Sequence, residues 1–203
     1  MEQTKIGFDL DETLVYGDII KEAGRQLGFI CNNSDVTTLN LDGIPPPVRD
    51  KAIELFSDPI HAALNKKFLP GIPYLLKYLY DETYFSVHII TSRPEHLLAP
   101  TVSMFKASSI IPNRFKFHFP NKEIDIKLTD NRPKKLDIIT KLKLDMYFDD
   151  AVCHCDEAIA AGVHQVFLVS NKHTPWNHGV IDKRIRRIKS ILDLNSWEFH
   201  NGI

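Results

Sequence analysis

The sequence predicts an α/β fold, in which a Rossmann-like parallel sheet has helices on both faces and a small helical cap is inserted after the first strand. Two observations support this. Over residues 70–194, short apolar runs alternate with segments of helical periodicity, and this alternation is typical of parallel sheets covered on both faces. Residues 17–68 show mainly helical periodicity. We therefore expect a core of residues 1–16 and 69–203 and a cap of residues 17–68.

The composition is that of an ordinary globular protein. The chain has 203 residues, 43% of them hydrophobic and 25% charged, and its net charge of -1 gives no general attraction to nucleic acid or membrane. The first strand begins without a signal-like segment, and no apolar run is long enough to span a membrane. Three cysteines without framework spacing argue against a disulfide-stapled secreted fold. We expect a soluble cytoplasmic protein.

The first strand ends in a pair of acids. Apolar residues at positions 6, 8 and 10 alternate with Gly7 and Asp9, which predicts a short buried strand that delivers Asp9 and Asp11 into a loop, with Thr13 close behind. Residues two apart on an extended chain point the same way. Crowded carboxylates repel, so either one is protonated or a cation lies between them, and Mg2+ suits oxygen ligands. The alternative is turn chemistry that closes a strand.

The cap and the start of the core contain four predicted helices and two breaks. The helices run from Asp18 to Gly28, from about Val48 to Phe56, from Asp58 to Lys67 and from Ile72 to Tyr80. The polar segment Asn32–Pro47 separates the first two, and Leu69-Pro70-Gly71 precedes the fourth.

The second strong strand, Phe85–Ile90, leads into a hydroxyl-rich turn. Ser92 and Glu95 have the spacing of a capping box and Pro94 falls in the first turn, so we expect a helix to begin here and to run to about Lys106. Free N–H groups and side-chain donors at such a turn suit a phosphate, and Arg93 could assist. The alternative is a plain helix cap.

The last third of the chain continues the alternation. We expect strands at Phe115–Phe119, Asp145–Phe148 and Gln165–Val169, and helices from Pro133 to about Leu142, from Asp156 to Ala161 and from Val180 to Leu194. Residues 122–132 are polar and irregular, and Ser196–Ile203 forms a loosely held tail. Lys134 and Lys135 stand in a helix first turn, where acids are usual, so they invite a functional explanation.

Three predicted strand ends carry polar groups: the loop Asp9–Thr13, the pair Thr91-Ser92 and the pair Asp149-Asp150. In parallel sheets, ligands gather outside the carboxyl ends of the strands. Each group has a structural alternative when taken alone. Their equivalent topological placement favours a common site.

With these residues, the chain resembles the haloacid dehalogenase (HAD) superfamily of phosphatases over its whole length. The four motifs of the family are matched by FDLDETLV, IITSRP, a lysine at Lys134-Lys135, and YFDD. The second aspartate separates phosphatases from true dehalogenases in this family. Glu12 departs from the glycine that is more frequent at its position.

The resemblance implies a role for each motif residue. Asp9 would be the nucleophile that forms an aspartyl-phosphate, and Asp11 the acid/base. Thr91 with Ser92 would hold phosphoryl oxygens, and Lys135 or Lys134 would neutralise charge. The remaining expected contacts are to phosphate from Leu10, Thr13 and Arg93, and to Mg2+ from Asp9, Asp150 and the Asp11 backbone carbonyl. Asp149 would orient the ligands or the lysine.

The cap position resembles the 5′(3′)-deoxyribonucleotidase branch of the family. This implies a small phosphorylated substrate, a nucleotide in the first place, and Tyr16, Phe56 and Phe68 could stack on its base. The alternative is that these aromatic residues form the core of the cap.

Two other functions and one other metal remain to be weighed. The same chemistry could act on a nucleic-acid 3′-phosphate or a sugar phosphate, or the chain could be a non-catalytic binding protein with this fold. Cys153-His154-Cys155-Asp156 is too closely spaced for zinc and has no second ligand pair, so no zinc is expected. The sequence gives no indication of the oligomeric state.

Overall fold

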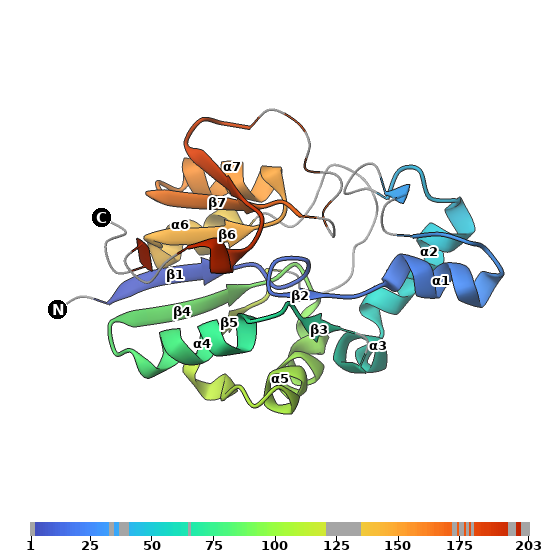
Figure 1. Ribbon diagram of the computed structural model, residues 1–203, viewed down its shortest axis with the longest axis horizontal. Coiled ribbons are helices and arrows are strands. Elements are labelled where there is room, and N and C mark those ends of the chain that lie inside the picture. Colours follow the sequence, from blue (N-terminus) through green and yellow to red (C-terminus); the bar gives the residue numbers. More distant parts are fainter. Residues whose placement is uncertain are drawn as a thin grey trace.

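The computed structural model describes residues 3–32, 35–36, 41–64, 66–120, 135–171, 174, 177, 179, 181–194 and 198–199. Its centre is a six-stranded parallel sheet in the order β5-β4-β1-β6-β7-β8 (Figure 1). The strands are β1 (Thr4–Phe8), β4 (Phe85–Ile90), β5 (Lys116–His118), β6 (Met146–Asp149), β7 (Gln165–Val169) and β8 (Ile185–Ile188). The predicted fold class is confirmed.

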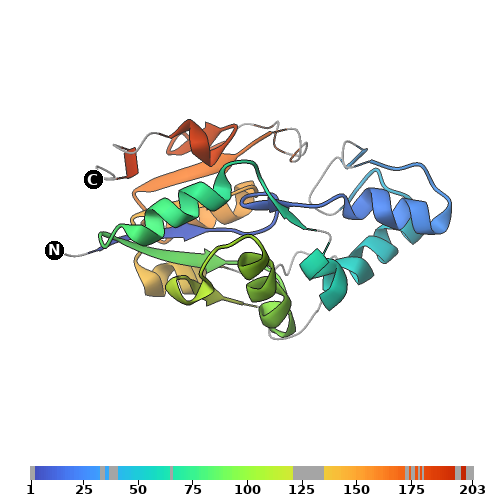
Figure 2. The same ribbon diagram turned by 60° about the horizontal axis from the view of Figure 1, so that its bottom comes forward.

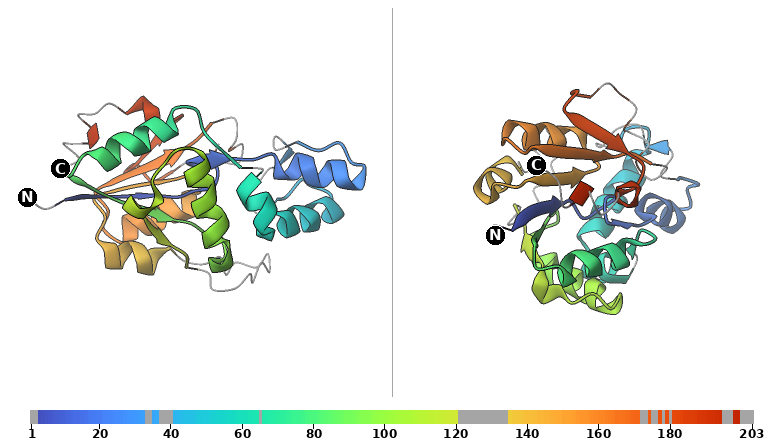
Figure 3. Two further views of the ribbon diagram at one scale, coloured as in Figure 1. Left: turned by 90° about the horizontal axis from the view of Figure 1, so that it is seen from below. Right: turned by 60° about the vertical axis from the view of Figure 1, so that its left-hand side comes forward.

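Helices cover both faces of this sheet. The helices of the core are α4 (Ile72–Asp81), α5 (Leu98–Ala107), α6 (Leu136–Leu142) and α7 (Val152–Ala160). Buried side chains of α4 and α5 join Ile6 and Phe8 of β1 in one hydrophobic cluster, whereas α6 and α7 join Tyr147 of β6 in another. Figure 3 shows α4 and α6 on opposite sides of the sheet. The core is therefore divided in two by the sheet, and the carboxyl ends of all six strands meet at one edge.

The segment between the first strand and α4 forms a separate helical unit. It contains α1 (Ile19–Leu27), α2 (Pro46–Ser57) and α3 (Pro59–Leu64), with its own small cluster of buried residues that includes Ile20, Val48 and Leu55. Two short antiparallel strands, β2 (Val15–Tyr16) and β3 (Lys67–Phe68), carry the chain out of the core and back. Figure 2 shows these three helices beyond the end of the sheet.

The prediction of a helix over Val180–Leu194 was wrong. The segment contains strand β8 and a short 3-10 turn at Ile191–Asp193. Ile185 and Ile188 are three apart, which fits a helix, but they are buried in different clusters on opposite faces of the sheet. Residues at odd spacing on a strand face opposite ways, so the same spacing also fits an edge strand buried on both sides.

Two helix starts also differ from the prediction. Helix α7 begins at Val152, four residues before the predicted Asp156, because the buried face of its first turns is made of small residues such as Cys155 that give a weak apolar signal. The expected capping box is absent: Pro94 precedes a 3-10 turn at Glu95–Leu97 without a side-chain cap. A residue before proline avoids the helical conformation, so Arg93 cannot begin the helix.

The tail is part of the core at one point at least. Phe199 is 2% exposed and its ring centroid lies 6.1 Å from that of Phe148 in β6. The prediction of a loosely held tail was therefore wrong at Phe199. The expected irregular segment 122–132 and the helix start at Pro133 lie outside the described residues. Within the described part of the chain, no helix is long and apolar enough to cross a membrane.

Candidate active site

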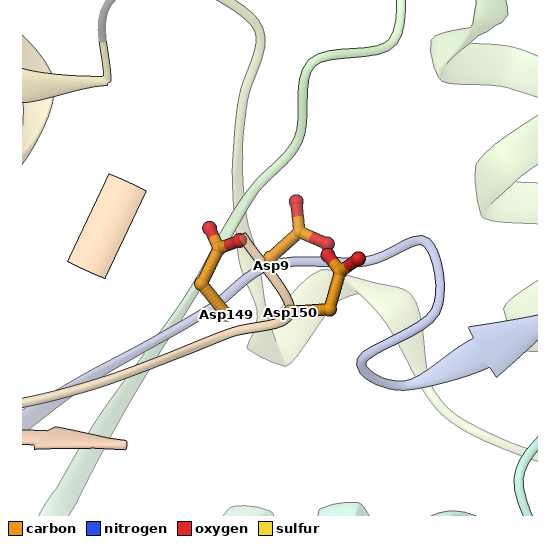
Figure 4. A group of neighbouring side chains, drawn as sticks. All are labelled: Asp9, Asp149 and Asp150. Atoms are coloured by element: carbon orange, nitrogen blue, oxygen red, sulfur yellow. The ribbon is translucent and has the colours of Figure 1, made fainter. Parts of the chain in front are cut away.

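Three buried carboxylates meet at the carboxyl ends of β1 and β6. These strands are paired with Phe8 opposite Phe148, and the Asp9 N–H donates to the Phe148 carbonyl at 2.8 Å. This register brings Asp9 beside Asp149 and Asp150. One carboxylate oxygen of each acid lies within 4.8 Å of the others, and Figure 4 shows the side chains of Asp9 and Asp150 turned toward each other. The structure thus brings together Asp9, Asp149 and Asp150, which the sequence analysis placed at the ends of two strands.

Lys135 supplies the cation of this cluster. It stands at the start of α6, is 1% exposed, and donates to Asp9 Oδ1 at 2.5 Å and to Asp149 Oδ2 at 2.8 Å. A buried ammonium requires such partners because its desolvation is costly. Lys134 lies outside the described residues.

Two further groups, both close to it in the chain, hold the Asp149 carboxylate. The Tyr147 hydroxyl donates to Asp149 Oδ2 at 2.5 Å, and the Ala151 N–H donates to Oδ1 at 2.8 Å. Tyr147 and Asp149 are two apart on β6 and therefore share a face. The Tyr147 ring passes over Gly7 of β1, where a Cβ would come within 2.9 Å of that ring and 2.4 Å of Leu144. The absence of a side chain at Gly7 makes room for the residues that position Asp149.

The backbone at Asp150 is held from a separate loop. The Asn177 side-chain amide donates to the Asp150 carbonyl and, at 3.3 Å, to that of Val169 at the end of β7. Asn177 is 2% exposed. This contact ties the loop after β7 to the carboxylate cluster.

Asp11 lies in a second charge network beside the first. The Arg93 guanidinium donates two hydrogen bonds to its carboxylate, from Nε to Oδ2 at 2.7 Å and from Nη2 to Oδ1 at 2.8 Å. Its Nη1 donates to the Thr101 hydroxyl at 3.0 Å. Lys66 Nζ lies 3.2 Å from Asp11 Oδ1 and 3.4 Å from Glu12 Oε1. Arg93 is therefore placed as the partner of Asp11, and not as the free anion-binding group that the sequence suggested.

Four residues expected to bind phosphate, at positions 10, 13, 91 and 92, lie in the segments that follow β1 and β4. Thr91 is fully buried; its N–H donates to the His118 carbonyl at 3.1 Å, and its hydroxyl accepts from the Arg93 N–H at 3.2 Å. Ser92 is half-buried beside it. The Leu10 carbonyl accepts from the N–H groups of residues 14 and 15 and closes the loop that carries Asp11 and Glu12. The Thr13 hydroxyl is buried without a hydrogen-bond partner among the described residues.

Burial sets the protonation of the clustered acids. It raises the pKa of Asp9 to about 6, and the carboxylates of Asp149 and Asp11 add to the rise while Lys135 opposes it. Burial, Asp149 and Asp9 likewise raise the pKa of Asp150 well above its usual range. Burial also acts on Asp149 and Asp11, but Lys135 lowers the pKa of the first, and Arg93 and Lys66 lower that of the second.

The donor set fits a hard divalent cation. The contacting side chains comprise five carboxylates, at positions 9, 11, 12, 149 and 150, and three cations, at positions 66, 93 and 135. Two negative charges are left over when all are ionised, and this excess adds to the effect of burial in raising the pKa values of Asp9 and Asp150. Carboxylate oxygens at one point of a buried site are ligands that Mg2+ prefers.

The three expected cap aromatics differ in their surroundings. Phe68 packs edge-on against Phe105 at 5.0 Å between ring centroids, so its ring contributes to the core. Phe56 in α2 is half-buried, and Lys66 Nζ lies 5.9 Å from its ring centroid. Tyr16 in β2 is half-buried at the junction of core and helical unit.

Sequence reasoning missed Tyr147 and Lys66 as residues of the site, and it missed the partner of Arg93. Tyr147 could have been found, because it precedes Asp149 by two positions on a predicted strand. The pairing of Arg93 with Asp11, and the approach of Lys66 and Asn177, left no local signal, because each joins segments that are far apart in the chain.

Solved structures of HAD-like proteins share this fold. A haloacid dehalogenase-like hydrolase of Streptococcus pneumoniae is 17% identical, with 91% of this chain and 93% of that chain covered and a TM-score of 0.51. A predicted phosphoglycolate phosphatase of Haemophilus somnus is 15% identical (85% and 87% covered, TM-score 0.54). A HAD family hydrolase of Deinococcus radiodurans with bound phosphate and sodium is 16% identical (81% and 80% covered, TM-score 0.53).

Comparison of the amino-acid sequence with known proteins identifies no family for this chain. No family model matches the chain, and no curated protein matches it. At identities of 15–17% the likeness establishes the HAD-like fold, and function must be argued from the site.

Proposed function

We propose that this protein is a Mg2+-dependent phosphomonoesterase that works through an aspartyl-phosphate on Asp9. The observation that carries the proposal is the contact of Lys135 with both Asp9 and Asp149 at the strand ends where Asp150 and Asp11 also lie. Asp9 is thus buried beside the Lys135 ammonium and close to Asp149 and Asp150, whose carboxylates could bind metal. Asp11 follows Asp9 on the same loop.

The reaction has two steps. An Asp9 oxygen attacks phosphorus and the bond to the ester oxygen breaks. The leaving oxygen takes a proton from Asp11, which has to separate from Arg93 and Lys66 to carry that proton, because both cations lower the pKa of its carboxyl group. Asp11, now a carboxylate, then takes a proton from water as the water oxygen attacks phosphorus. The bond from phosphorus to Asp9 breaks, and phosphate leaves.

The residues of the cluster supply charge neutralisation. Lys135 offsets charge on Asp9 and on the phosphoryl group, while Thr91, Ser92, Thr13 and the loop backbone at Leu10 would bind phosphoryl oxygens. Mg2+, held by Asp9, Asp150 and the Asp11 carbonyl, would stabilise the charge that develops on the transferred group. Asp149 orients Lys135 through the 2.8 Å hydrogen bond.

Phosphate release from p-nitrophenyl phosphate tests the activity. We expect turnover with Mg2+, loss of turnover with EDTA, and loss in Asp9→Asn. Asp137→Asn, an exposed acid in the first turn of α6, is the matched control and should remain active. Asp11→Asn should release about one p-nitrophenolate per protein and then stop, because the phosphoenzyme loses its general base. Full turnover by Asp9→Asn would contradict the proposal.

The substrate is proposed to be a small phosphorylated metabolite that is enclosed by the helical unit of residues 17–68, acting as a cap. A nucleoside monophosphate is supported by the half-buried Phe56 beside Lys66 and by Tyr16, whose rings could stack on a base. The packing of Phe68 in the core leaves it out of this role.

A non-nucleotide phosphate ester is the second candidate, supported by the structural likeness to the protein named as a phosphoglycolate phosphatase. Initial rates on deoxynucleoside monophosphates, hexose phosphates and phosphoglycolate decide between them. If the substrate is a nucleotide, Phe56→Ala should raise KM for nucleotides and leave kcat/KM for p-nitrophenyl phosphate within ~3-fold, since stacking on a base contributes about 1–3 kcal/mol. An equal loss on every ester would count against a base-stacking role.

A further inference from the structure

The residue that opens α6 does not cap the helix with its own side chain. Lys135 is the N-cap, and its side chain makes no hydrogen bond to the helix backbone, because an ammonium group carries donors and no acceptor. Its Nζ is turned instead to Asp9 and Asp149. The first N–H groups of a helix lack partners within the helix, so the start of α6 needs an acceptor from another part of the chain.

Glu157 of α7 supplies that acceptor. The Leu136 N–H donates to Glu157 Oε2 at 3.1 Å, and the two residues are 21 apart in the chain. His154, one turn earlier on α7, has its Nδ1 3.5 Å from the same oxygen. The Glu157 side chain is 21% exposed, so most of it is shielded from solvent. Its carboxylate thus connects α7 to the residue that immediately follows Lys135.

Helix α6 is held against α7 by two kinds of contact. Ile139, near the middle of α6, is buried in one cluster with Cys155 and Ala158 of α7. Apolar burial of this kind is not directional, and it leaves the helix free to shift along its axis. A hydrogen bond is directional, so the Glu157 contact determines where the helix backbone begins. The long side chain of Lys135 reaches the carboxylates from that point.

We propose that Glu157 is a positioning residue, which fixes the start of α6 so that the Lys135 ammonium stays between Asp9 and Asp149. This inference rests on the proposed phosphatase function and deepens it, because it assigns the placement of the charge-neutralising lysine to a residue outside the four motifs. Lys135 offsets charge that develops on the transferred phosphoryl group, so its displacement should lower kcat more than it raises KM.

Two variants of Glu157 separate its hydrogen bond from its charge. Glu157→Gln loses the charge but keeps an oxygen acceptor at the same reach, whereas Glu157→Asp keeps the charge and withdraws it from the Leu136 N–H by one methylene. With p-nitrophenyl phosphate and Mg2+, we expect kcat to fall ~10-fold in Glu157→Asp, with KM within ~3-fold, and to stay within ~3-fold of the wild type in Glu157→Gln.

The exposed neighbour provides the control. Asp156→Asn removes a charge from the same turn of α7 and should leave kcat unchanged. Glu157→Ala removes the acceptor altogether, so it should show the same loss as Glu157→Asp and takes its place if that variant does not fold. Thermal unfolding identifies a temperature at which every variant is folded, and kcat is compared there.

The outcomes are distinct. A loss of kcat in Glu157→Asp that Glu157→Gln does not share supports the positioning role. An equal or larger loss in Glu157→Gln would assign the effect to charge, and an unchanged kcat in both variants would leave Glu157 a purely structural role. Either result overturns the inference while the active wild type leaves the phosphatase proposal intact. A wild-type protein that does not hydrolyse p-nitrophenyl phosphate with Mg2+ overturns both proposals.

Discussion

Replacing Asp9, the proposed nucleophile, should make the metal-free protein more stable. Burial raises the pKa of Asp9 from 3.8 to about 6, so the ionised carboxylate is less favourable in the folded chain than in the unfolded chain. The shift is about two pKa units, which at ~1.4 kcal/mol per unit corresponds to about 3 kcal/mol. Asn has nearly the shape of a protonated Asp and carries no charge. Asp9→Asn should therefore gain up to about 3 kcal/mol while abolishing activity.

The sign of the pH dependence follows from the direction of the shift. Because the pKa of folded Asp9 lies above that of the unfolded chain, the stability associated with this group is complete below about pH 4 and is lost as the pH rises through 6. The gain in Asp9→Asn should thus be close to zero at pH 4 and largest at pH 8. Mg2+ should reduce or reverse it, because a cation binding to the wild-type carboxylates offsets their repulsion.

Urea denaturation at pH 4.5 and pH 8, with EDTA and with Mg2+, measures these differences. Asp149→Asn is the contrasting variant. Although burial opposes it, Lys135 lowers the pKa of Asp149, and Tyr147 and the Ala151 N–H donate to its oxygens. Asn at this position should destabilise the protein at pH 8. Our account of the cluster would be refuted if Asp9→Asn were no more stable than wild type at pH 8 without metal, or if its gain were the same at both pH values.

Three further predictions concern the same molecule. Lys135→Met removes the buried partner of two carboxylates, so it should cost about 3–5 kcal/mol and abolish phosphate release, as measured by thermal unfolding and by the p-nitrophenyl phosphate assay. Phe199→Ala should cost about 3–5 kcal/mol in urea denaturation because the ring is buried against Phe148; a cost below about 1 kcal/mol would show that the tail does not belong to the core. Burial and His118 lower the pKa of His88 from 6.5 to about 4, so protonation of His88 costs stability as the pH falls from 6.5 to 4, in opposition to the gain from Asp9. In urea denaturation, His88→Asn should therefore gain stability relative to the wild type as the pH falls over this range.

The sequence was sufficient for the parts of the site that lie at strand ends. Asp9, Thr91 and Asp150 each follow a strongly apolar strand, and parallel pairing brings such positions to one edge without further information. It could not choose between Lys134 and Lys135, because a lysine pair offers no local signal for which side chain turns inward. Lys135 is 1% exposed and lies between the carboxylates of Asp9 and Asp149. Its burial depends on where α6 begins.

The sequence predictions that differ from the structure share one cause, which is that they depend on contacts between segments that are far apart in the chain. Arg93 precedes a proline and follows a strand, which suggested an anion site, yet its partner Asp11 is 82 residues away in the chain. Ile185 and Ile188 satisfy the period of a helix and also the two faces of an edge strand, and only the neighbouring strand β7 decides between them. Periodicity measures burial along one segment, so it cannot identify the surface against which that segment is buried.

Gly7 shows that the geometry of the carboxylate cluster depends on a residue inside the sheet. It has no functional group and lies inside β1, but its missing side chain lets the Tyr147 ring lie close to the strand. The hydroxyl of that ring orients Asp149, which in turn holds Lys135. A methyl group at this point would push the ring outward and disturb the nucleophile through three successive contacts. A screen of random variants for inactive but folded protein should therefore recover substitutions at a position where chemistry alone would give no reason to look.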